Sequence, residues 1–248
     1  MDRTAFYPEM EINAIMPRLA AADLELLADD VDQIQVLITG SDEAVQALKL
    51  TCEEGRLRLD QPAYGVAPRP MGMHWVQVML RLPRAWKGIV DASTMTGDIR
   101  ARGISGTDLQ LETMTGSLDA AGVNAITMKA VTVSGSQRLS GIQAEALHLR
   151  TVSGGMEGTG IQARSLRVTA VSGSTTLQLD SDFDLLEANL VSGGLRVTAP
   201  VAEADASIRS ISGRLLTSGV SIQKGGPVVS ATTVTGYVEL ICGADSAL

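Results

Sequence analysis

Met95-Thr96-Gly97 is the first of eight copies of one short phrase: an apolar residue, then Ser or Thr, then Gly. The other copies are Met114-Thr115-Gly116, Val133-Ser134-Gly135, Val152-Ser153-Gly154, Val171-Ser172-Gly173, Val191-Ser192-Gly193, Ile211-Ser212-Gly213 and Val234-Thr235-Gly236. Their glycines are separated by 19, 19, 19, 19, 20, 20 and 23 residues. Such a period is typical of a solenoid, in which each coil buries its apolar face against its neighbours. The repeats predict an all-β, single-stranded β-helix, right-handed, with coils of 19 to 20 residues.

The columns within the repeat predict how each coil is built. The residue before Ser or Thr is Met, Val or Ile in all eight phrases, and we expect it to point into the core. A second glycine follows the first by six residues in five coils, namely Gly103, Gly122, Gly141, Gly160 and Gly219. Glycine suits sharp corners because it adopts positive φ at little cost. We therefore expect parallel sides joined by glycine corners.

The N-terminal part lacks the repeat but alternates apolar and polar residues, as in Gln33–Ile38 and Trp75–Leu82. Residues 44–50 fit either a helical turn or a strand. A Pro- and Gly-rich loop is expected over 61–72. We expect residues 1–93 to form an irregular, strand-rich segment that caps the solenoid, and residues 94–248 to form the repeat coils of the same continuous domain.

The repeat becomes irregular after Gly173. The second corner glycine is missing from the next two coils, and the last full coil lengthens to 23 residues around Lys224–Pro227. Extra residues in a solenoid usually leave as loops from one face, which is often the binding face. The loops of residues 174–232, or a flat outer sheet face, are therefore the predicted binding surfaces.

Composition excludes several classes of function. Apolar residues make up 45% of the chain, which excludes a disordered protein, and aromatic residues only 3%, which is unusual for an enzyme pocket. The net charge of −8 argues against a nucleic-acid partner. Cys52 and Cys242 have no CxxC spacing, so we expect small buried hydrophobic residues, with a disulfide or metal role as the alternative.

The first thirty residues carry charges throughout, and no apolar h-region interrupts them. They therefore predict no secretory signal. No stretch approaches 18 consecutive apolar residues, so no membrane span is expected. The sequence predicts a cytoplasmic protein, with a surface location left open.

Candidate chemistry is sparse. Asp180, Asp182 and Asp184 alternate, with Glu187 nearby, which suggests oxygen ligands for calcium. The EF-hand pattern fails, since Leu185 stands where Gly is needed and Val191 where Glu is needed. A solvated surface is the favoured interpretation and a cation site the alternative.

His74 and His148 have no partners at useful spacing, and His148, between Leu147 and Leu149, is expected at the surface. The serines follow the corner pattern and lack the context of a nucleophile elbow. We expect no catalytic, cofactor-binding or metal-binding residues, and a protein that is not an enzyme.

The repeated Val-Ser-Gly phrases follow a strand-rich segment that ends in the run Val76 to Pro83. In this the chain resembles a bacterial family of uncharacterised proteins labelled "putative adhesins", over residues 75–240 above all. The resemblance implies a single-stranded β-helix and a binding role, and it supplies no catalytic residues. The bactofilins, which are cytoskeletal polymers with comparable coils, are the second family that the repeats resemble.

These observations predict a non-enzymatic binding or scaffolding protein whose ligand is an unknown protein or glycan. The alternatives are a bactofilin-like structural polymer and a carbohydrate-active β-helix enzyme, which would gather two or three carboxylates in one groove. A monomer or weak homodimer is expected, because residues 1–74 carry many charges and five prolines, whereas the run Tyr237–Cys242 predicts an open C-terminal end.

Overall fold

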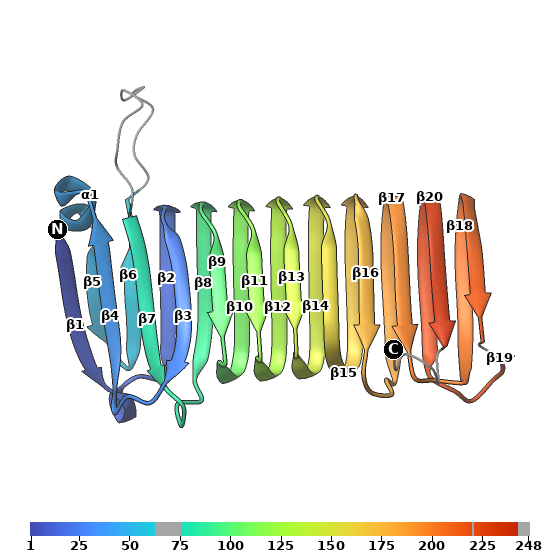
Figure 1. The fold of residues 1–248 in the computed structure, drawn as a ribbon, viewed down its shortest axis with the longest axis horizontal. Coiled ribbons are helices and arrows are strands. Elements are labelled where there is room, and N and C mark those ends of the chain that lie inside the picture. Colours follow the sequence, from blue (N-terminus) through green and yellow to red (C-terminus); the bar gives the residue numbers. More distant parts are fainter. Residues whose placement is uncertain (63–75, 220, 243–248) are drawn as a thin grey trace, which may run out of the picture.

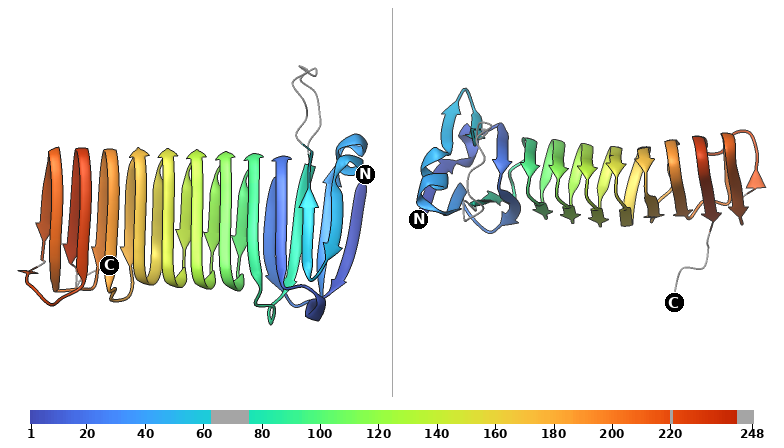
Figure 2. Two further views of the ribbon diagram at one scale, coloured as in Figure 1. Left: turned by 180° about the vertical axis from the view of Figure 1, so that it is seen from behind. Right: turned by 90° about the horizontal axis from the view of Figure 1, so that it is seen from above.

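The computed structural model describes residues 1–62, 76–219 and 221–242. In it the chain forms a long, flat rod of stacked coils, with the irregular N-terminal strands at one end (Figure 1). The view from above shows that the coils have two walls (Figure 2). The predicted all-β solenoid is confirmed, whereas its handedness stays a prediction.

The regular coils occupy the middle of the rod. Each has a long strand on one wall and a short strand on the other, and strands of one wall pair in parallel with a register offset of one coil. The long strand β15 continues through both walls. The strands of this region are β8 (Ile89–Thr96), β9 (Ile99–Arg102), β10 (Ser105–Thr115), β11 (Leu118–Ala121), β12 (Asn124–Ser134), β13 (Gln137–Ser140), β14 (Gln143–Ser153), β15 (Met156–Ser172), β16 (Ser174–Leu179) and β17 (Leu185–Ala199).

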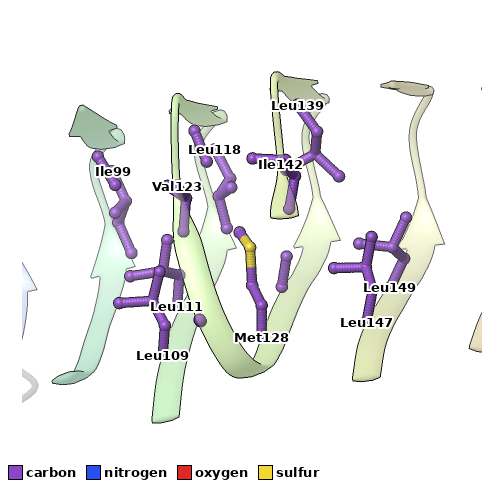
Figure 3. Packing of buried hydrophobic residues seen from close by; sticks show 14 of the residues in the cluster. Ile99, Leu109, Leu111, Leu118, Val123, Met128, Leu139, Ile142, Leu147 and Leu149 are labelled. Atoms are coloured by element: carbon purple, nitrogen blue, oxygen red, sulfur yellow. The ribbon is translucent and has the colours of Figure 1, made fainter. Parts of the chain in front are cut away.

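Like side chains stack on like in the core between the walls. Leu109, Met128, Leu147 and Leu166 follow one another in register on consecutive long strands, and all four have no exposed surface. The short strands contribute Leu118 and Leu139 from the other wall (Figure 3). Neighbouring strands lie about 4.8 Å apart, so each side chain packs against its counterparts above and below. Because stacked aliphatic side chains fill the core, the chain needs few aromatic residues.

The expectation that the Met, Val or Ile before Ser or Thr points into the core is wrong. Met95, Met114 and Val133 are 49%, 50% and 38% exposed, and the other members of the column also reach the surface. The residue one position earlier points inward instead, as Thr113 and Thr132 do. Alternation along β10 explains this: Leu109, Leu111 and Thr113 all face the core, so the next residue faces solvent. The first corners thus carry a line of exposed apolar side chains along the rod.

The inward threonines satisfy backbone groups at the corners. The Thr113 hydroxyl donates to the carbonyl oxygen of Gly97 at 3.1 Å, and the Thr233 hydroxyl donates to the carbonyl oxygen of Thr235 at 3.2 Å. A Val side chain at these positions could not do this, because it has no donor. Both glycine corners were predicted correctly: φ is +146° at Gly135 and +63° at Gly122.

At the N-terminal end, sequence order and spatial order differ. β2 (Ala14–Ala21) and β3 (Asp23–Asp29) form the coil that stacks on β8 and β9. On their other side β6 (Arg56–Asp60) pairs with β2 and β7 (Val76–Pro83) pairs with β3, all in parallel. The remaining elements are β1 (Asp2–Pro8), a 3-10 turn (Glu9–Glu11), β4 (Gln33–Gly40), α1 (Asp42–Ala47) and β5 (Lys49–Glu53).

The pairing turns antiparallel at this end, where β4 pairs with β7, β1 with β4, and β5 with β6. The segment 44–50, which the sequence left open, begins in helix α1 and ends in strand β5. The predicted boundary at residue 93 lies inside β8, and the division into cap and coils stays a prediction. Most of the expected loop at 61–72 lies outside the described residues.

The C-terminal end also departs from sequence order. β18 (Glu203–Ser218) and β19 (Ser221–Ile222) precede β20 (Val228–Cys242) in the chain, yet β20 lies between β17 and β18 (Figure 1). The expectation that Tyr237–Cys242 forms the open end is therefore wrong. β20 pairs on both sides, and β18 ends the rod.

Candidate functional site

A groove runs along the rod where the second corners lead into the long strands. It has a volume of about 520 Å³ and crosses the coils of β10, β12, β14 and β15. Its lining comprises Lys87, Ser105, Gly106, Thr107, Asn124, Ala125, Ile126, Gln143, Ala144, Glu145, Gln162, Ala163, Arg164, Ser181 and Asp182. The groove thus spans four successive coils and brings side chains of each coil to one surface.

The floor of the groove consists of small residues in one column. Gly106, Ala125, Ala144 and Ala163 are in register on consecutive coils. The next residue in each coil, such as Ile126, takes no part in the ladder, so the strand bends there. Ala125 and Ala163 belong to the hydrophobic core and Ala144 packs against it, so the surface is low along this column and the exposed residues on either side stand above it.

One wall of the groove is a column of amides. Asn124, Gln143 and Gln162 follow one another in register and are exposed. Their backbone N–H groups are fixed by the preceding coils, as in the 2.8 Å bond from Gln143 to the carbonyl oxygen of Val123. Within residues 1–62, 76–219 and 221–242 their side-chain amides form no hydrogen bond. Each amide therefore offers donors and an acceptor to a ligand.

Charges in the groove are balanced. Lys87 and Arg164 carry positive charge, and Glu145 and Asp182 carry negative charge. The two carboxylates belong to coils on either side of the coil of Arg164, because Glu145 is on β14 and Asp182 follows β16. Both carboxylate residues are exposed. This arrangement suits a ligand without large net charge.

The irregular coils form a second, shallower hollow next to the groove. Its volume is about 620 Å³, and it lies between three turns, residues 182–184, 200–203 and 225–227. Asp182 lines both hollows. The loops of the 174–232 region, which the sequence singled out, thus border one end of the groove.

The acidic residues proposed for calcium do not share one site. Asp180, Asp182 and Asp184 are all exposed around the buried side chain of Phe183, and Gln178 donates to Asp180 at 3.5 Å. Glu187 instead accepts hydrogen bonds from Arg167 at 2.8 and 3.0 Å. Among the described residues no group of three or more His, Cys, Asp or Glu side chains could hold a metal ion.

Of the two cysteines and His74, only Cys52 has a side chain among the described residues. Cys52 is exposed on β5, so the expectation that it is buried is wrong: β5 is an edge strand that faces solvent. His74 and the side chain of Cys242 lie outside the described residues. No helix in the described chain has the length and apolar character to cross a bilayer.

His148 lies half-buried in a row of cationic side chains. Lys129, His148 and Arg167 are in register on β12, β14 and β15. Burial lowers the pKa of His148 below 6.5, the charges of Arg167 and Lys129 lower it further, and Glu187 acts in the opposite direction. Carboxylates form ion pairs with the two ends of this row: Glu112 pairs with Lys129 at 2.8 Å, and Glu187 pairs with Arg167.

This row predicts a pH effect on stability. As the pH is lowered through 6.5, His148 takes up a proton at a higher pH in the unfolded chain than in the folded chain. The free energy of unfolding therefore decreases as the pH is lowered. The variant His148→Gln has no imidazole at this position, so it lacks this decrease in the free energy of unfolding. Urea unfolding at about pH 8 and about pH 5 should show the variant gaining stability relative to wild type at the lower pH. A His148 NMR titration midpoint at or above 6.5 would contradict the prediction, and the variant distinguishes its signal from that of His74.

The amide column was not among the predicted sites, although the sequence carries a signal for it. The residue two positions past each second-corner glycine is polar in four successive coils, namely Ser105, Asn124, Gln143 and Gln162. A column that repeats across coils lies along one line of a solenoid. What the sequence did not show is that this line borders a hollow.

Comparison with known proteins assigns the chain to a family. A family model described as Toastrack DUF4097 matches residues 12–240. The chain belongs to the Toastrack DUF4097 family. A comparison with functionally curated proteins finds no match for this Toastrack chain.

Solved structures of other bacterial proteins align with the chain over most of its length. A "putative adhesin" from Bacteroides fragilis aligns with a TM-score of 0.62 and 13% identity, covering 97% of each chain. A "putative adhesin" from Parabacteroides merdae aligns with a TM-score of 0.45 and 14% identity, covering 97% of this chain and 95% of that one. The Bacteroides fragilis likeness shows a common fold.

Proposed function

We propose that this Toastrack protein is a non-enzymatic binding protein that holds an extended glycan chain in the groove. The main support for this proposal is the column of free amides Asn124, Gln143 and Gln162 beside the small-residue floor. Side-chain amides both donate and accept, as sugar hydroxyls do. The name "putative adhesin" of the Bacteroides fragilis structure is in keeping with a binding role.

The spacing of the column favours a glycan over a peptide. Successive amides are one coil apart, about 4.8 Å, which is close to the length of one pyranose ring in an extended chain. An extended peptide advances about 3.4 Å per residue, and its side chains on one face repeat at twice that distance. A peptide lying along the groove would therefore fall out of step with the amides within two coils.

The groove holds two carboxylates, as the enzyme alternative requires, but their placement favours binding over catalysis. Glu145 and Asp182 are two coils apart, with Arg164 on the coil between them, and both are exposed. A glycosidase needs a general acid whose pKa is raised by an apolar or like-charged setting. Glu145 and Asp182 are exposed to solvent and not set in an apolar pocket, and the cation of Arg164 stands on the coil between them.

A binding screen tests the proposal. The probes are neutral oligosaccharides: cellohexaose, chitohexaose, xylohexaose, mannohexaose and laminarihexaose. The double variant Gln143→Ala/Gln162→Ala should bind the best of them roughly tenfold more weakly, because each lost hydrogen bond is worth about 0.5–1.5 kcal/mol.

Gln77→Ala is the matched control, because Gln77 is an exposed amide on β7, away from the groove. It should bind like wild type. The proposal is contradicted if wild type binds none of the five sugars, or if the double variant binds as tightly as Gln77→Ala. Shortened oligosaccharides after long incubation would contradict the non-enzymatic role.

A further inference from the structure

A third hollow adjoins the groove at its N-terminal end. This N-terminal hollow has a volume of about 340 Å³ and is lined by residues 9, 10, 12, 13, 86–89 and 107. Lys87 and Thr107 line both the N-terminal hollow and the groove. At the other end, Asp182 is shared by the groove and the hollow of the irregular coils, which we call the C-terminal hollow. The groove and the two hollows therefore follow one another without interruption, and we call them together the extended groove.

The extended groove runs along almost the whole rod. The segments that form it join strands at the lower edge of the rod in Figure 1. From its first coil to its last, the strands of the long wall pair in the order β2, β8, β10, β12, β14, β15, β17, β20 and β18, which makes eight steps. At about 4.8 Å per step the extended groove is roughly 38 Å long. With one pyranose ring per step it has room for about eight sugars, and its central part for about four.

The N-terminal hollow combines apolar side chains with a free amide. Met10 is 96% exposed and Ile89 is 43% exposed, so both offer apolar surface to a ligand. Asn13 is exposed, and among the described residues its side-chain amide forms no hydrogen bond. The backbone is held in place, because the N–H of Ile89 donates to the carbonyl oxygen of Asn13 at 2.9 Å and the Trp86 indole donates to that of Ile12 at 2.8 Å. Sugar rings present C–H faces as well as hydroxyls, so apolar surface beside an amide suits them.

The C-terminal hollow offers acceptors on a fixed backbone. Asp184 and Glu203 are exposed, and carboxylate oxygens accept hydrogen bonds from hydroxyls. The side chain of Phe183 between the acidic residues is buried and anchors their turn in the core. The N–H of Val228 donates to the carbonyl oxygen of Asp184 at 2.9 Å, which joins this turn to the start of β20. The hollow therefore continues the polar lining of the groove past its last amide.

We infer that the ligand of the groove is a long, linear glycan, of which about eight consecutive sugars occupy the groove and both hollows. The inference rests on the proposed glycan site and adds the length of chain that this site selects. A chain of four sugars fills only the central part, so the sugars beyond it make new contacts in the hollows. Affinity should therefore increase with chain length up to about eight sugars and then level off.

A chain-length series tests the inference. The probes are the tetraose and the octaose of the sugar that binds best in the screen, and isothermal titration calorimetry measures both. The octaose should bind roughly thirtyfold or more tightly than the tetraose, with one octaose per chain, because each added sugar can form further hydrogen bonds. If only four sugars were bound, the octaose would gain about fivefold at most, since it contains five overlapping stretches of four sugars.

Substitutions in the two hollows locate the added contacts. Asn13→Ala in the N-terminal hollow and Glu203→Ala in the C-terminal hollow should each weaken octaose binding roughly three- to tenfold and leave tetraose binding unchanged. Gln143→Ala/Gln162→Ala should weaken the binding of both sugars. The matched controls are Gln77→Ala and Glu157→Ala, because Gln77 on β7 and Glu157 on β15 are exposed and lie outside the extended groove.

The outcomes separate this inference from the proposed function. Circular dichroism verifies that every variant is folded. The longer site is overturned if the octaose binds no more than about fivefold more tightly than the tetraose, or if both hollow variants bind the octaose like the controls. The proposed function stands in that case as long as tetraose binding depends on Gln143 and Gln162. If neither sugar binds, the proposed function and this inference are both contradicted.

Discussion

Replacing Gly135 by alanine is expected to lower the free energy of unfolding by more than about 4 kcal/mol, or to prevent folding. A Cβ atom at this position would lie 1.9 Å from the carbonyl oxygen of Gly116 in the coil before. That oxygen belongs to the backbone and cannot move without shifting its coil. Gly154 stands in the same relation to Gly135, so the first corners touch glycine to glycine along the rod.

Gly122→Ala is the control, because it makes the same change at a second corner. Its φ is +63°, and the nearest atoms to an added Cβ lie 3.9 Å away. Only the left-handed backbone opposes alanine there, at roughly 1–2 kcal/mol. Urea unfolding followed by circular dichroism measures both variants. Equal losses would show that close backbone approach does not set the cost at the first corner.

Leu147→Ala is expected to cost about 2–5 kcal/mol, the range for removing a fully buried leucine. Its side chain lies between Met128 and Leu166 of the coils on either side and has no exposed surface, so deletion leaves a cavity in the stack. Val133→Ala is the comparison, since Val133 is 38% exposed and should lose less than about 1 kcal/mol. A loss at Val133 as large as that at Leu147 would show that the corner valines are buried after all.

The fold could be predicted from the sequence because its signals repeat. Glycine at a constant spacing and alternating apolar residues specify coils, corners and parallel pairing without reference to distant parts of the chain. The assignment of the Met, Val and Ile column failed for a local reason. It relied on the apolar character of Val133, whereas Leu109, Leu111 and Thr113 show that a threonine takes the inward position and binds the corner backbone.

The order of the last coils could not be predicted from spacing. β17, β18 and β20 carry equivalent phrases ending in Gly193, Gly213 and Gly236, so each can pair with either of the others in the same register. Their order depends on connections that have no repeat. The groove was missed for a related reason: the amides are visible as a column, but the hollow beside them arises from the bend at Ile126 and its equivalents.

Side-chain amide NMR signals of Asn124, Gln143 and Gln162 provide the most direct test of glycan binding in the groove. The protein is titrated with the oligosaccharide that binds best in the screen. All three signals should shift along one binding curve, while that of Gln77 stays unchanged. Glycan binding in the groove is contradicted if the three amides do not move while other signals shift, such as the methyl groups of Met95 and Met114 on the exposed apolar line.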